Sequence, residues 1–426
     1  MRTFALRLIG FVICAGVSSG AADLDREIVL APQSGSAVED REIGRWQDAA
    51  RGVRATEENW LRLASAYVAK ARRTLDAGYY KLAEKTVTVA EGQFGASAES
   101  RLIRGHVLHN LHRFAEAEAI ARRLVAERAA PADFALLSDA LMEQGKLAGA
   151  IAAVQQLLNL KPGVEAYTRV AQLRWWKGDL PGAVAAMELA LAANAPGDTE
   201  ARGWMLARLS AFALQAGEVG RARTRADEAN AQLGDFAPAL LARGRALLAV
   251  HDLGGAIAAL ERAAALNPLP EYEWWLADAL RLAGDGQKAG AVEDRLRRRG
   301  AAADPRTFAL FLATRGENSG LAVRLAADEL RQRGDGLTHD AYAWALLASG
   351  DPAAADAEMH AALAEHTGDP RLALHAGEIA HCRGRLAEAA AFFADAARGA
   401  AALTPSEQAL VRRRLAPSEP FLSHNP

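Results

Sequence analysis

Histidine and cysteine are the residue types in this chain that could bind a transition metal. His106, His109 and His112 follow one another at intervals of three, and a second group within 23 residues comprises His360, His366, His375, His381 and Cys382. Imidazole nitrogen and thiolate sulfur are good ligands for zinc and related metals. In a helix, however, His106 and His112 would lie about 120° apart and could not easily share one ion. We therefore expect no metal and no other cofactor, and a histidine-based metal-binding accessory is kept as an alternative.

One segment formally matches a catalytic motif. Residues 16–20 read G-x-S-x-G, the turn that presents the nucleophile of many hydrolases. That turn needs a strand before it, and these residues instead lie in an apolar N-terminal segment. The P-loop, G-x-G-x-x-G, H-E-x-x-H and C-x-x-C motifs do not occur in the sequence, which removes the usual support for nucleotide, zinc-protease and thiol-redox chemistry. We therefore expect no enzymatic activity.

The N-terminus is typical of an exported protein. Arg2 and Arg7 precede fifteen uncharged residues, 8–22, which end before Asp23. A membrane-spanning helix needs about 20 apolar residues, so we predict a cleaved signal peptide at 1–22 and no membrane span after cleavage, with a retained anchor as the alternative. The protein would be periplasmic or secreted. Removal of Cys14 would leave Cys382 alone, where we expect a small buried apolar residue.

Composition and charge exclude some broad classes of protein. Of the 426 residues, 51% are apolar and 24% are charged, which is a globular composition and rules out bulk disorder. The net charge is −2, from 50 basic and 52 acidic residues. Such a balance gives no global electrostatic reason to expect binding to nucleic acid or to an anionic membrane surface.

Alanine and glycine recur with a nearly constant period, which is the sequence sign of a repeat architecture. The alanines stand at intervals of 34, 33, 33, 39, 34, 33, 33, 33 and 34 residues and are Ala83, Ala117, Ala150, Ala183, Ala222, Ala256, Ala289, Ala322, Ala355 and Ala389. Five residues before them, with glycine at seven of ten sites, stand Gly78, His112, Gly145, Gly178, Gly217, His251, Gly284, Glu317, Gly350 and Gly384. The two series keep one register and predict about ten copies of one structural unit.

Each site of this period has a physical reason. The glycine can adopt the left-handed conformation that ends a helix. The alanine, one turn into the next helix, lets two helix backbones cross closely. Seven residues before the glycine site another small residue would complete that crossing, at Gly105, Ser138, Ala171, Ser210, Gly244, Ala277, Ala343 and Gly377. Leu310 breaks this series in the copy where Glu317 replaces glycine, which makes that copy the weakest.

Two segments carry a resemblance to a known family. They are Phe134, Leu137, Ser138, Leu141, Gly145, Leu147, Ala150, Val154, Leu157, Pro162 and Leu240, Gly244, Leu247, His251, Leu253, Ala256, Leu260, Ala263, Pro268. Both resemble the 34-residue signature of the tetratricopeptide repeat family, in particular its exported bacterial members. The resemblance implies an all-α fold, an α-solenoid of about ten helix-turn-helix repeats that forms a right-handed superhelix.

The domain organisation follows from this register. We place repeats 1 to 4 at residues 58–191 and repeats 5 to 10 at 200–400, with an extended connection at 192–199. Residues 23–57 would form a flexible lead over 23–35 and a capping helix over 37–51. Residues 401–426 would form a C-terminal capping helix and tail, because the last repeat of a solenoid otherwise exposes its stacking face.

The resemblance also implies where a partner would bind. The first helices of tetratricopeptide repeats line a concave groove, and in this chain the matching sites hold Arg169, Trp175, Trp176, Trp204, Arg208, Arg245, Trp274, Trp275, Phe308, Phe311 and Trp344. Tryptophan and arginine are enriched at the energetically important positions of interfaces, although packing between repeats could also use these side chains. We expect a non-enzymatic exported scaffold or adaptor that binds a partner protein or peptide. The alternative is an oligomerising accessory of envelope assembly or transport.

Overall fold

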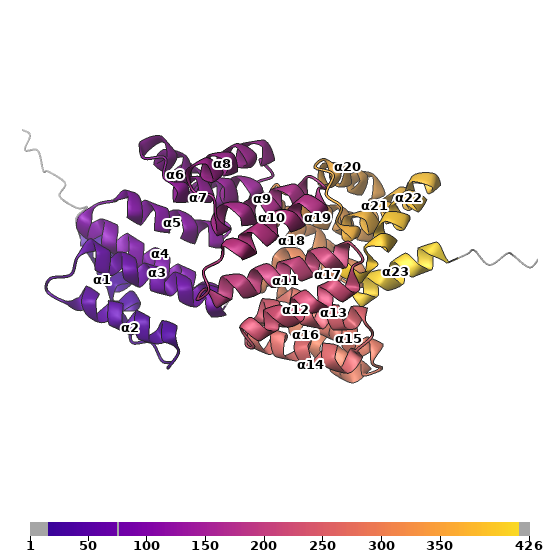
Figure 1. The fold of residues 1–426 in the computed structure, drawn as a ribbon, viewed down its shortest axis with the longest axis horizontal. Coiled ribbons are helices and arrows are strands. Elements are labelled where there is room, and N and C mark those ends of the chain that lie inside the picture. Colours follow the sequence, from indigo (N-terminus) through magenta and orange to yellow (C-terminus); the bar gives the residue numbers. More distant parts are fainter. Residues whose placement is uncertain (1–15, 75, 417–426) are drawn as a thin grey trace, which may run out of the picture. The chain divides into compact units, whose positions relative to one another are not determined.

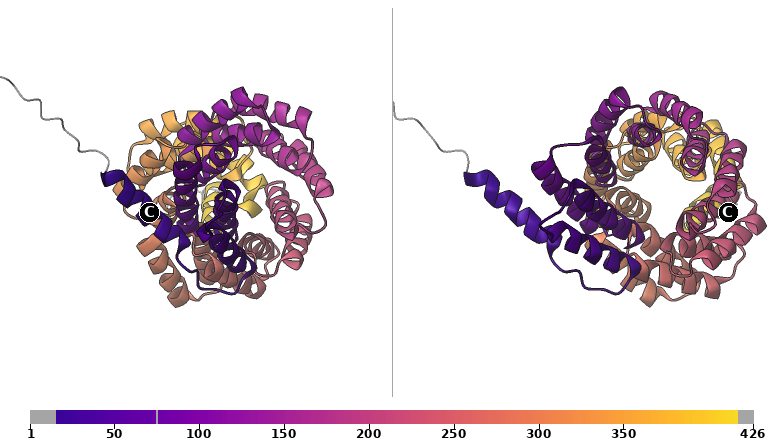
Figure 2. Two further views of the ribbon diagram at one scale, coloured as in Figure 1. Left: turned by 90° about the vertical axis from the view of Figure 1, so that its left-hand side faces the viewer. Right: turned by 60° about the vertical axis from the view of Figure 1, so that its left-hand side comes forward.

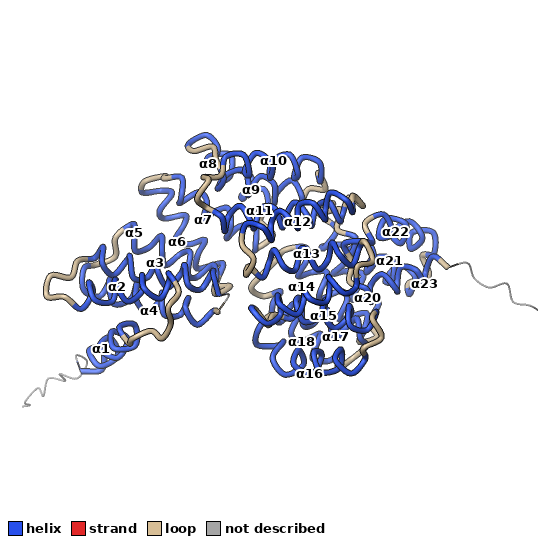
Figure 3. The backbone as a smooth tube through the Cα atoms, turned by 60° about the horizontal axis from the view of Figure 1, so that its bottom comes forward, coloured by secondary structure: helices blue, strands red, loops and turns tan. Residues whose placement is uncertain are grey.

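The computed structural model describes residues 16–74 and 76–416. Every regular element in this part of the chain is a helix, and none is a strand (Figures 1 and 3). From α3 to α22 the helices alternate as ten antiparallel pairs, one pair to each predicted repeat. This confirms the all-α repeat fold. The chain divides into two compact units, Met1–Leu124 and Val125–Pro426, called unit 1 and unit 2 below.

Unit 1 holds the first repeats and the helices before them. Its helices are α1 (Gly16–Leu30), α2 (Val38–Arg51), α3 (Glu57–Thr74), α4 (Ala77–Phe94) and α5 (Ala98–Asn110), and α6 (Phe114–Glu127) ends just beyond it. The core of this unit centres on Trp60, Leu63 and Tyr67, all completely buried.

The predicted flexible lead at 23–35 is wrong for its first part, because α1 continues to Leu30. Val29 is completely buried, and its carbonyl oxygen accepts hydrogen bonds from the Tyr67 hydroxyl at 2.6 Å and from Gln47 Nε2 at 2.9 Å. An apolar residue and a satisfied carbonyl thus fix the segment on the core. The predicted signal peptide falls largely on residues 1–15, outside the described residues. Within the described residues, no helix combines the length and the apolar character that a membrane span requires.

Unit 2 holds the remaining eight pairs and a C-terminal segment (Figure 2). Its helices are α7 (Pro131–Glu143), α8 (Leu147–Leu160), α9 (Val164–Trp176), α10 (Leu180–Ala193), α11 (Thr199–Gln215), α12 (Val219–Gln232), α13 (Ala237–Ala249), α14 (Leu253–Leu266), α15 (Pro270–Leu282), α16 (Gly286–Ala303), α17 (Pro305–Arg315), α18 (Ser319–Leu330), α19 (Gly336–Ala348), α20 (Pro352–Leu363), α21 (Pro370–Cys382), α22 (Leu386–Arg398), η1 (Ala400–Ala402) and α23 (Pro405–Leu415). A short connection separates α10 from α11 at the predicted break.

The predicted helix-ending sites are left-handed in eight of the ten repeats. Their φ angles lie between 60° and 90°, at Gly145, Gly178, Gly217, Gly284, Gly350, Gly384, His112 and His251. After each of them the next amide donates back to the preceding helix, as Lys146 N does to the Leu141 carbonyl at 2.9 Å. This is the Schellman closure of a helix. The period in the sequence therefore reports a real backbone requirement.

Gly78 is the first exception. It lies in the first turn of α4, where its amide donates to the side chain of the N-cap residue Asp76 at 2.8 Å. Helix α3 has already ended at Thr74. The prediction that Gly78 ends a helix is therefore wrong.

The second exception is the repeat that the sequence made the weakest. Gly316, not Glu317, takes the left-handed conformation with φ 66°, and Glu317 N donates to the Leu312 carbonyl at 2.9 Å. Counted from Gly316, the small residue of the helix crossing is Ala309, which is completely buried. Leu310 thus only seemed to break the series, because the first helix and turn of this repeat are displaced by one residue, while Ala322 in the second helix keeps its place and is completely buried.

The helix crossings leave no room for a larger side chain at the small-residue sites. A Cβ atom added at Gly244 would lie 2.5 Å from Cγ of Leu260, and one added at Gly377 would lie 2.6 Å from Cε1 of Phe393. In both repeats the large side chain comes from the second helix. The crossing distance is therefore set by the missing side chain of the first helix.

This packing gives a direct test of the register. Ala150 is completely buried at the crossing of α7 and α8, whereas Ala152 on the same helix is exposed. We expect Ala150→Leu to lower the free energy of unfolding by about 1 to 3 kcal/mol through overpacking, and Ala152→Leu to change it by less than about 0.5 kcal/mol. Urea denaturation of both variants measures the difference. Equal midpoints would contradict the register.

In unit 2, turns that are far apart in sequence lie against one another. A Cβ atom added at Gly145 would meet the Gly334 carbonyl oxygen, and one added at Gly178 would meet the His366 carbonyl oxygen. Ion pairs link the same regions, with Arg333 bound to Glu143 and Lys177 bound to Glu365. The turns of the third and fourth repeats therefore contact the connections before α19 and α21, and this unit is closed by contacts between its early and late repeats.

The C-terminal segment is an integral part of unit 2. Glu407 of α23 is completely buried, and its carboxylate accepts from Arg371 Nε at 2.6 Å and from the Thr404 amide at 2.8 Å. The Ser406 amide donates to Asp278 Oδ2 at 2.9 Å. A C-terminal capping helix was expected within residues 401–426, and α23 lies in that range. It is held by buried polar contacts with α15 and α21.

Candidate functional site

Seven of the eight aromatic residues predicted to line a groove are buried in the core. These are Trp175, Trp176, Trp274, Trp275, Phe308, Phe311 and Trp344, each less than 10% exposed. The eighth, Trp204, is 43% exposed. The structure corrects the prediction for the seven, because a partner could reach them only by displacing the side chains that cover them.

Both members of each tryptophan pair are buried because they pack on different neighbours. Trp175 donates from Nε1 to Gln215 Oε1 at 2.8 Å, on the neighbouring helix α11. Trp176 lies beside the backbone of Gly336, which belongs to a repeat far along the chain. Contacts along the array and across unit 2 thus cover opposite faces of one helix.

The other buried aromatic residues form local clusters. The ring of Trp274 meets Phe311 edge to face, with 5.8 Å between centroids, and Phe311 stacks on Phe308. Trp344 stacks on His375 at 4.1 Å and donates from Nε1 to Thr314 Oγ1 at 3.0 Å. Arg169 is also engaged, because both oxygens of Asp139 accept from its guanidinium group. Trp344 and Arg169 are therefore engaged within the fold, while Nε1 of Trp274 is buried without a hydrogen-bond partner among the described residues.

The three remaining predicted residues come together. Trp204, Arg208 and Arg245 line a pocket of about 280 Å³ formed by the first helices α11, α13 and α15. The other lining residues are Ala207, Ser210, Ala211, Leu214, Pro238, Leu241, Ala242, Glu271 and Tyr272. The wall is largely apolar, and most of its hydrogen-bonding capacity belongs to the two arginines. We call this the arginine pocket.

The charges of the arginine pocket are poorly balanced. Arg208 donates to the neutral amide oxygen of Gln172 at 2.8 Å and lies over the rings of Trp175 and Phe212. Arg245 donates to the backbone carbonyl of Ala402 at 3.1 Å, while Glu271 Oε1 is 3.8 Å from its Nη1. The buried Nε of Arg245 has no hydrogen-bond partner among the described residues. Neither guanidinium group therefore has a carboxylate within hydrogen-bonding distance, although the charges of Asp369 and Glu271 act on both.

Burial acts on both arginines in the same direction. Burial, and then the positive charge of Arg245, lower the pKa of Arg208 to about 10. Burial is also the main cause that lowers the pKa of Arg245. A pKa of about 10 keeps Arg208 protonated at neutral pH, and the charges of Asp369 and Glu271 offset part of its positive charge.

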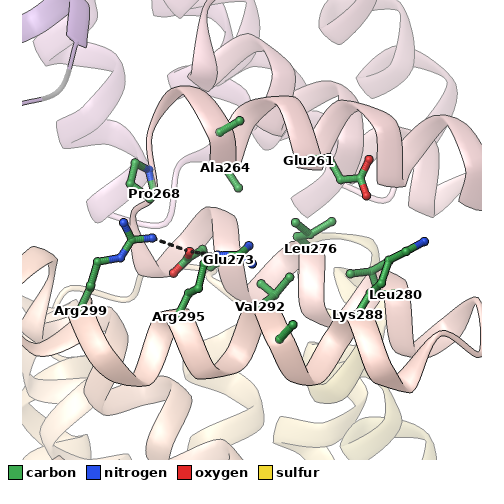
Figure 4. Close-up of a pocket in the computed structure, with 12 residues that line it drawn as sticks. Glu261, Ala264, Pro268, Glu273, Leu276, Leu280, Lys288, Val292, Arg295 and Arg299 are labelled. Atoms are coloured by element: carbon green, nitrogen blue, oxygen red, sulfur yellow. Dashed lines mark hydrogen bonds and ion pairs between the residues drawn. The ribbon is translucent and has the colours of Figure 1, made fainter.

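A second pocket, of about 470 Å³, pairs its arginines differently (Figure 4). Leu276, Leu280 and Val292 form part of its apolar wall. The buried carboxylate of Glu273 accepts from Arg295 Nε at 3.3 Å and from Arg299 Nη2 at 3.1 Å. Two arginines of α16 therefore already have a carboxylate partner within hydrogen-bonding distance.

His375 and His381 have structural partners. Nδ1 of His375 lies 2.8 Å from Asp340 Oδ1 in the interior, and Nε2 of His381 lies 3.1 Å from Arg414 Nη1. Over residues 16–74 and 76–416, no group of three or more His, Cys, Asp or Glu side chains is placed to hold a metal ion. Cys382 is exposed at the end of α21, so the prediction that it is buried is wrong.

Three residues that lie next to the two arginine side chains were missed by sequence reasoning. Gln172 is a conventional helix-face residue, and Glu271 lies in the first turn of α15, where acidic residues are common for a different reason. Ala402 contributes only its carbonyl group. The residue pattern gives no signal for a backbone acceptor that arrives from another part of the chain.

Comparisons with known proteins agree with the helix pairs. The family model described as Tetratricopeptide repeat matches residues 136–199 and 241–305, each of which spans two consecutive helix pairs. No curated protein matches the chain significantly.

Solved structures match over most of the chain at low identity. They include human IFIT1 with m7Gppp-AAAA, at 14% identity and TM-score 0.48, covering 89% of this chain and 94% of that one. The Cut9-Hcn1 structure matches at 13% identity and TM-score 0.43, covering 93% and 90%. Pseudomonas aeruginosa pilF matches at 14% identity and TM-score 0.38, covering 53% and 94%. The sequence matches and the repeated helix pair with its left-handed turn identify tetratricopeptide repeats at residues 136–199 and 241–305 of this chain.

Proposed function

We propose that this protein is a non-enzymatic, exported scaffold that binds a segment of a partner protein through the first helices of repeats 5 to 7. Repeats of this family are protein-interaction modules, which supports the general role. The observation that supports the location is the arginine pocket, where the exposed Trp204 adjoins two incompletely paired arginines. Export is supported by the basic and then apolar sequence of residues 1–22.

The arrangement of the pocket suits a protein segment more than a flat surface contact. A half-exposed tryptophan can bury further area on binding, and such anchors dominate interface energies. The apolar wall would hold a side chain while the arginines orient polar groups. The absence of catalytic motifs from the sequence supports a role in binding alone.

A site-specific crosslinking experiment tests this function. A photoreactive amino acid is placed at Trp204 or, as a control, at Leu189, an exposed apolar residue of the second helix α10. We expect residue 204, and not 189, to crosslink to one defined segment of a protein in the native envelope fraction. The purified partner should then bind Trp204→Ala roughly 30-fold more weakly than wild type. Equal crosslinking at both positions, or equal affinity, would reject the location.

A further inference from the structure

We propose that the arginine pocket receives an oxyanion, a carboxylate or a phosphate group, between the guanidinium groups of Arg208 and Arg245. This inference rests on the proposed function and names the chemistry by which the partner would be recognised. It starts from the contrast between the two pockets of unit 2. In one, the buried carboxylate of Glu273 accepts hydrogen bonds from both Arg295 and Arg299. In the other, no carboxylate lies within 3.5 Å of either arginine among the described residues.

The unused hydrogen-bonding capacity of the two arginines points to the same ligand. A guanidinium group has five N–H donors in a fixed planar arrangement that fits the two oxygens of a carboxylate or phosphate. Arg208 uses one nitrogen, toward Gln172, and Arg245 uses one nitrogen, toward the Ala402 carbonyl. Both of these acceptors are neutral, so an anion would form stronger, charge-assisted hydrogen bonds.

The positions of the arginines fix where the anion would be held. Arg208 comes from α11 and Arg245 from α13, and stacking on Trp175 and Trp275 respectively limits the directions that their side chains can take. Cζ of Arg245 lies 4.9 Å from the centroid of the Trp275 ring. The buried tryptophans thus have a role in positioning the arginines, although they do not line the pocket themselves.

Glu271 on the pocket rim offsets part of the charge of Arg245. Its side chain is about half exposed and lies 3.8 Å from Arg245, near enough to offset charge but not to form a hydrogen bond. A bound oxyanion would be repelled by Glu271 and attracted by the arginines. Removing the charge of Glu271 should therefore strengthen oxyanion binding, whereas removing either arginine should weaken it.

Calorimetric titration of the full mature chain tests this inference. The probes are inorganic phosphate, the peptide acetyl-Ala-Ala-Leu-Ala with a free C-terminal carboxylate, and its C-terminal amide. We expect phosphate or the free-acid peptide to bind more tightly than the amide. The affinity should fall at least tenfold in Arg208→Gln and in Arg245→Gln, and rise several-fold in Glu271→Gln. Arg174→Gln, on an exposed arginine of α9, should bind like wild type.

The outcomes separate the ligand sources and the two proposals. Binding of the peptide but not of phosphate identifies a carboxylate, and the reverse identifies a phosphate. Absence of binding by all probes, or unchanged affinity in both arginine variants, overturns the oxyanion site. Glu271→Gln keeps the test decisive if an arginine variant fails to fold, because unchanged affinity there would also contradict it. Crosslinking at residue 204 with no oxyanion binding would leave the scaffold function standing.

Discussion

Glu407→Gln is expected to lower the free energy of unfolding by about 3 to 5 kcal/mol, the range for breaking a buried ion pair by removing one charge. The Glu407 carboxylate is completely buried and binds Arg371 Nε at 2.6 Å and the Thr404 hydroxyl at 2.9 Å. Glutamine keeps the shape of the side chain but leaves the charge of Arg371 without its closest partner. Denaturant unfolding measures the loss.

The same residue should make stability depend on pH. Burial would raise the pKa of Glu407, but the charge and hydrogen bonds of Arg371 outweigh burial and hold the pKa below its usual value. A depressed pKa in the folded state stabilises the fold above the unfolded pKa, and this contribution is lost as pH falls through the folded value. Wild type should therefore lose stability below about pH 4 more steeply than Glu407→Gln.

An exposed pair provides the control for Glu407. Asp395 is half exposed and pairs with Arg398 within one helix turn, an arrangement that contributes little in water. Asp395→Asn should change the free energy of unfolding by less than about 0.5 kcal/mol. If Glu407→Gln were equally mild, the C-terminal helix would not be anchored as the structure shows.

Gly145→Ala is expected to be the second most destabilising change. Its φ of 70° strains any residue with a Cβ atom, and that atom would also meet the Gly334 carbonyl oxygen. Strain of about 1 to 2 kcal/mol from the left-handed conformation should combine with about 1 to 3 kcal/mol from the clash. Thermal or denaturant unfolding gives the sum.

Gly284 separates the two terms, because it occupies the equivalent site of another repeat. Its φ is 80°, and a Cβ atom there would meet nothing within 4 Å. Gly284→Ala should therefore show only the strain term. Equal losses in the two variants would mean that the contact between the turns at Gly145 and Gly334 contributes nothing to stability.

The repeats could be predicted because they depend on local rules. A left-handed turn, a small residue at a helix crossing and a helix end each depend on only a few neighbouring residues. The roles of Gly178 and Ala183 could therefore be predicted from the sequence. The displaced turn at Gly316 also obeys these rules, and only the assumption of a fixed interval obscured it.

The site could be predicted only in part because burial is not local. The family pattern placed Trp176 on an open inner face, but a distant repeat covers it at Gly336. Trp204 occupies a similar site and remains exposed. The prediction of a flexible N-terminal lead was wrong for a related reason. A single buried residue, Val29, packs in the same core as Tyr67, which lies about 40 positions later in the sequence.

The turn contacts of unit 2 have a consequence for how the chain opens. In an open array, local unfolding spreads inward from a terminus, and amide hydrogen exchange is fastest in the last repeat. Here Arg333 binds a residue 190 positions away and Lys177 one 188 positions away. Each of these ion pairs closes a large loop of the chain. The repeats inside the loop gain their full conformational freedom only when the ion pair breaks, because loop closure restricts the entropy of the segment between its ends. Exchange in α7 to α9 should therefore be coupled to exchange in α18 to α21, with early and late repeats opening as one cooperative unit.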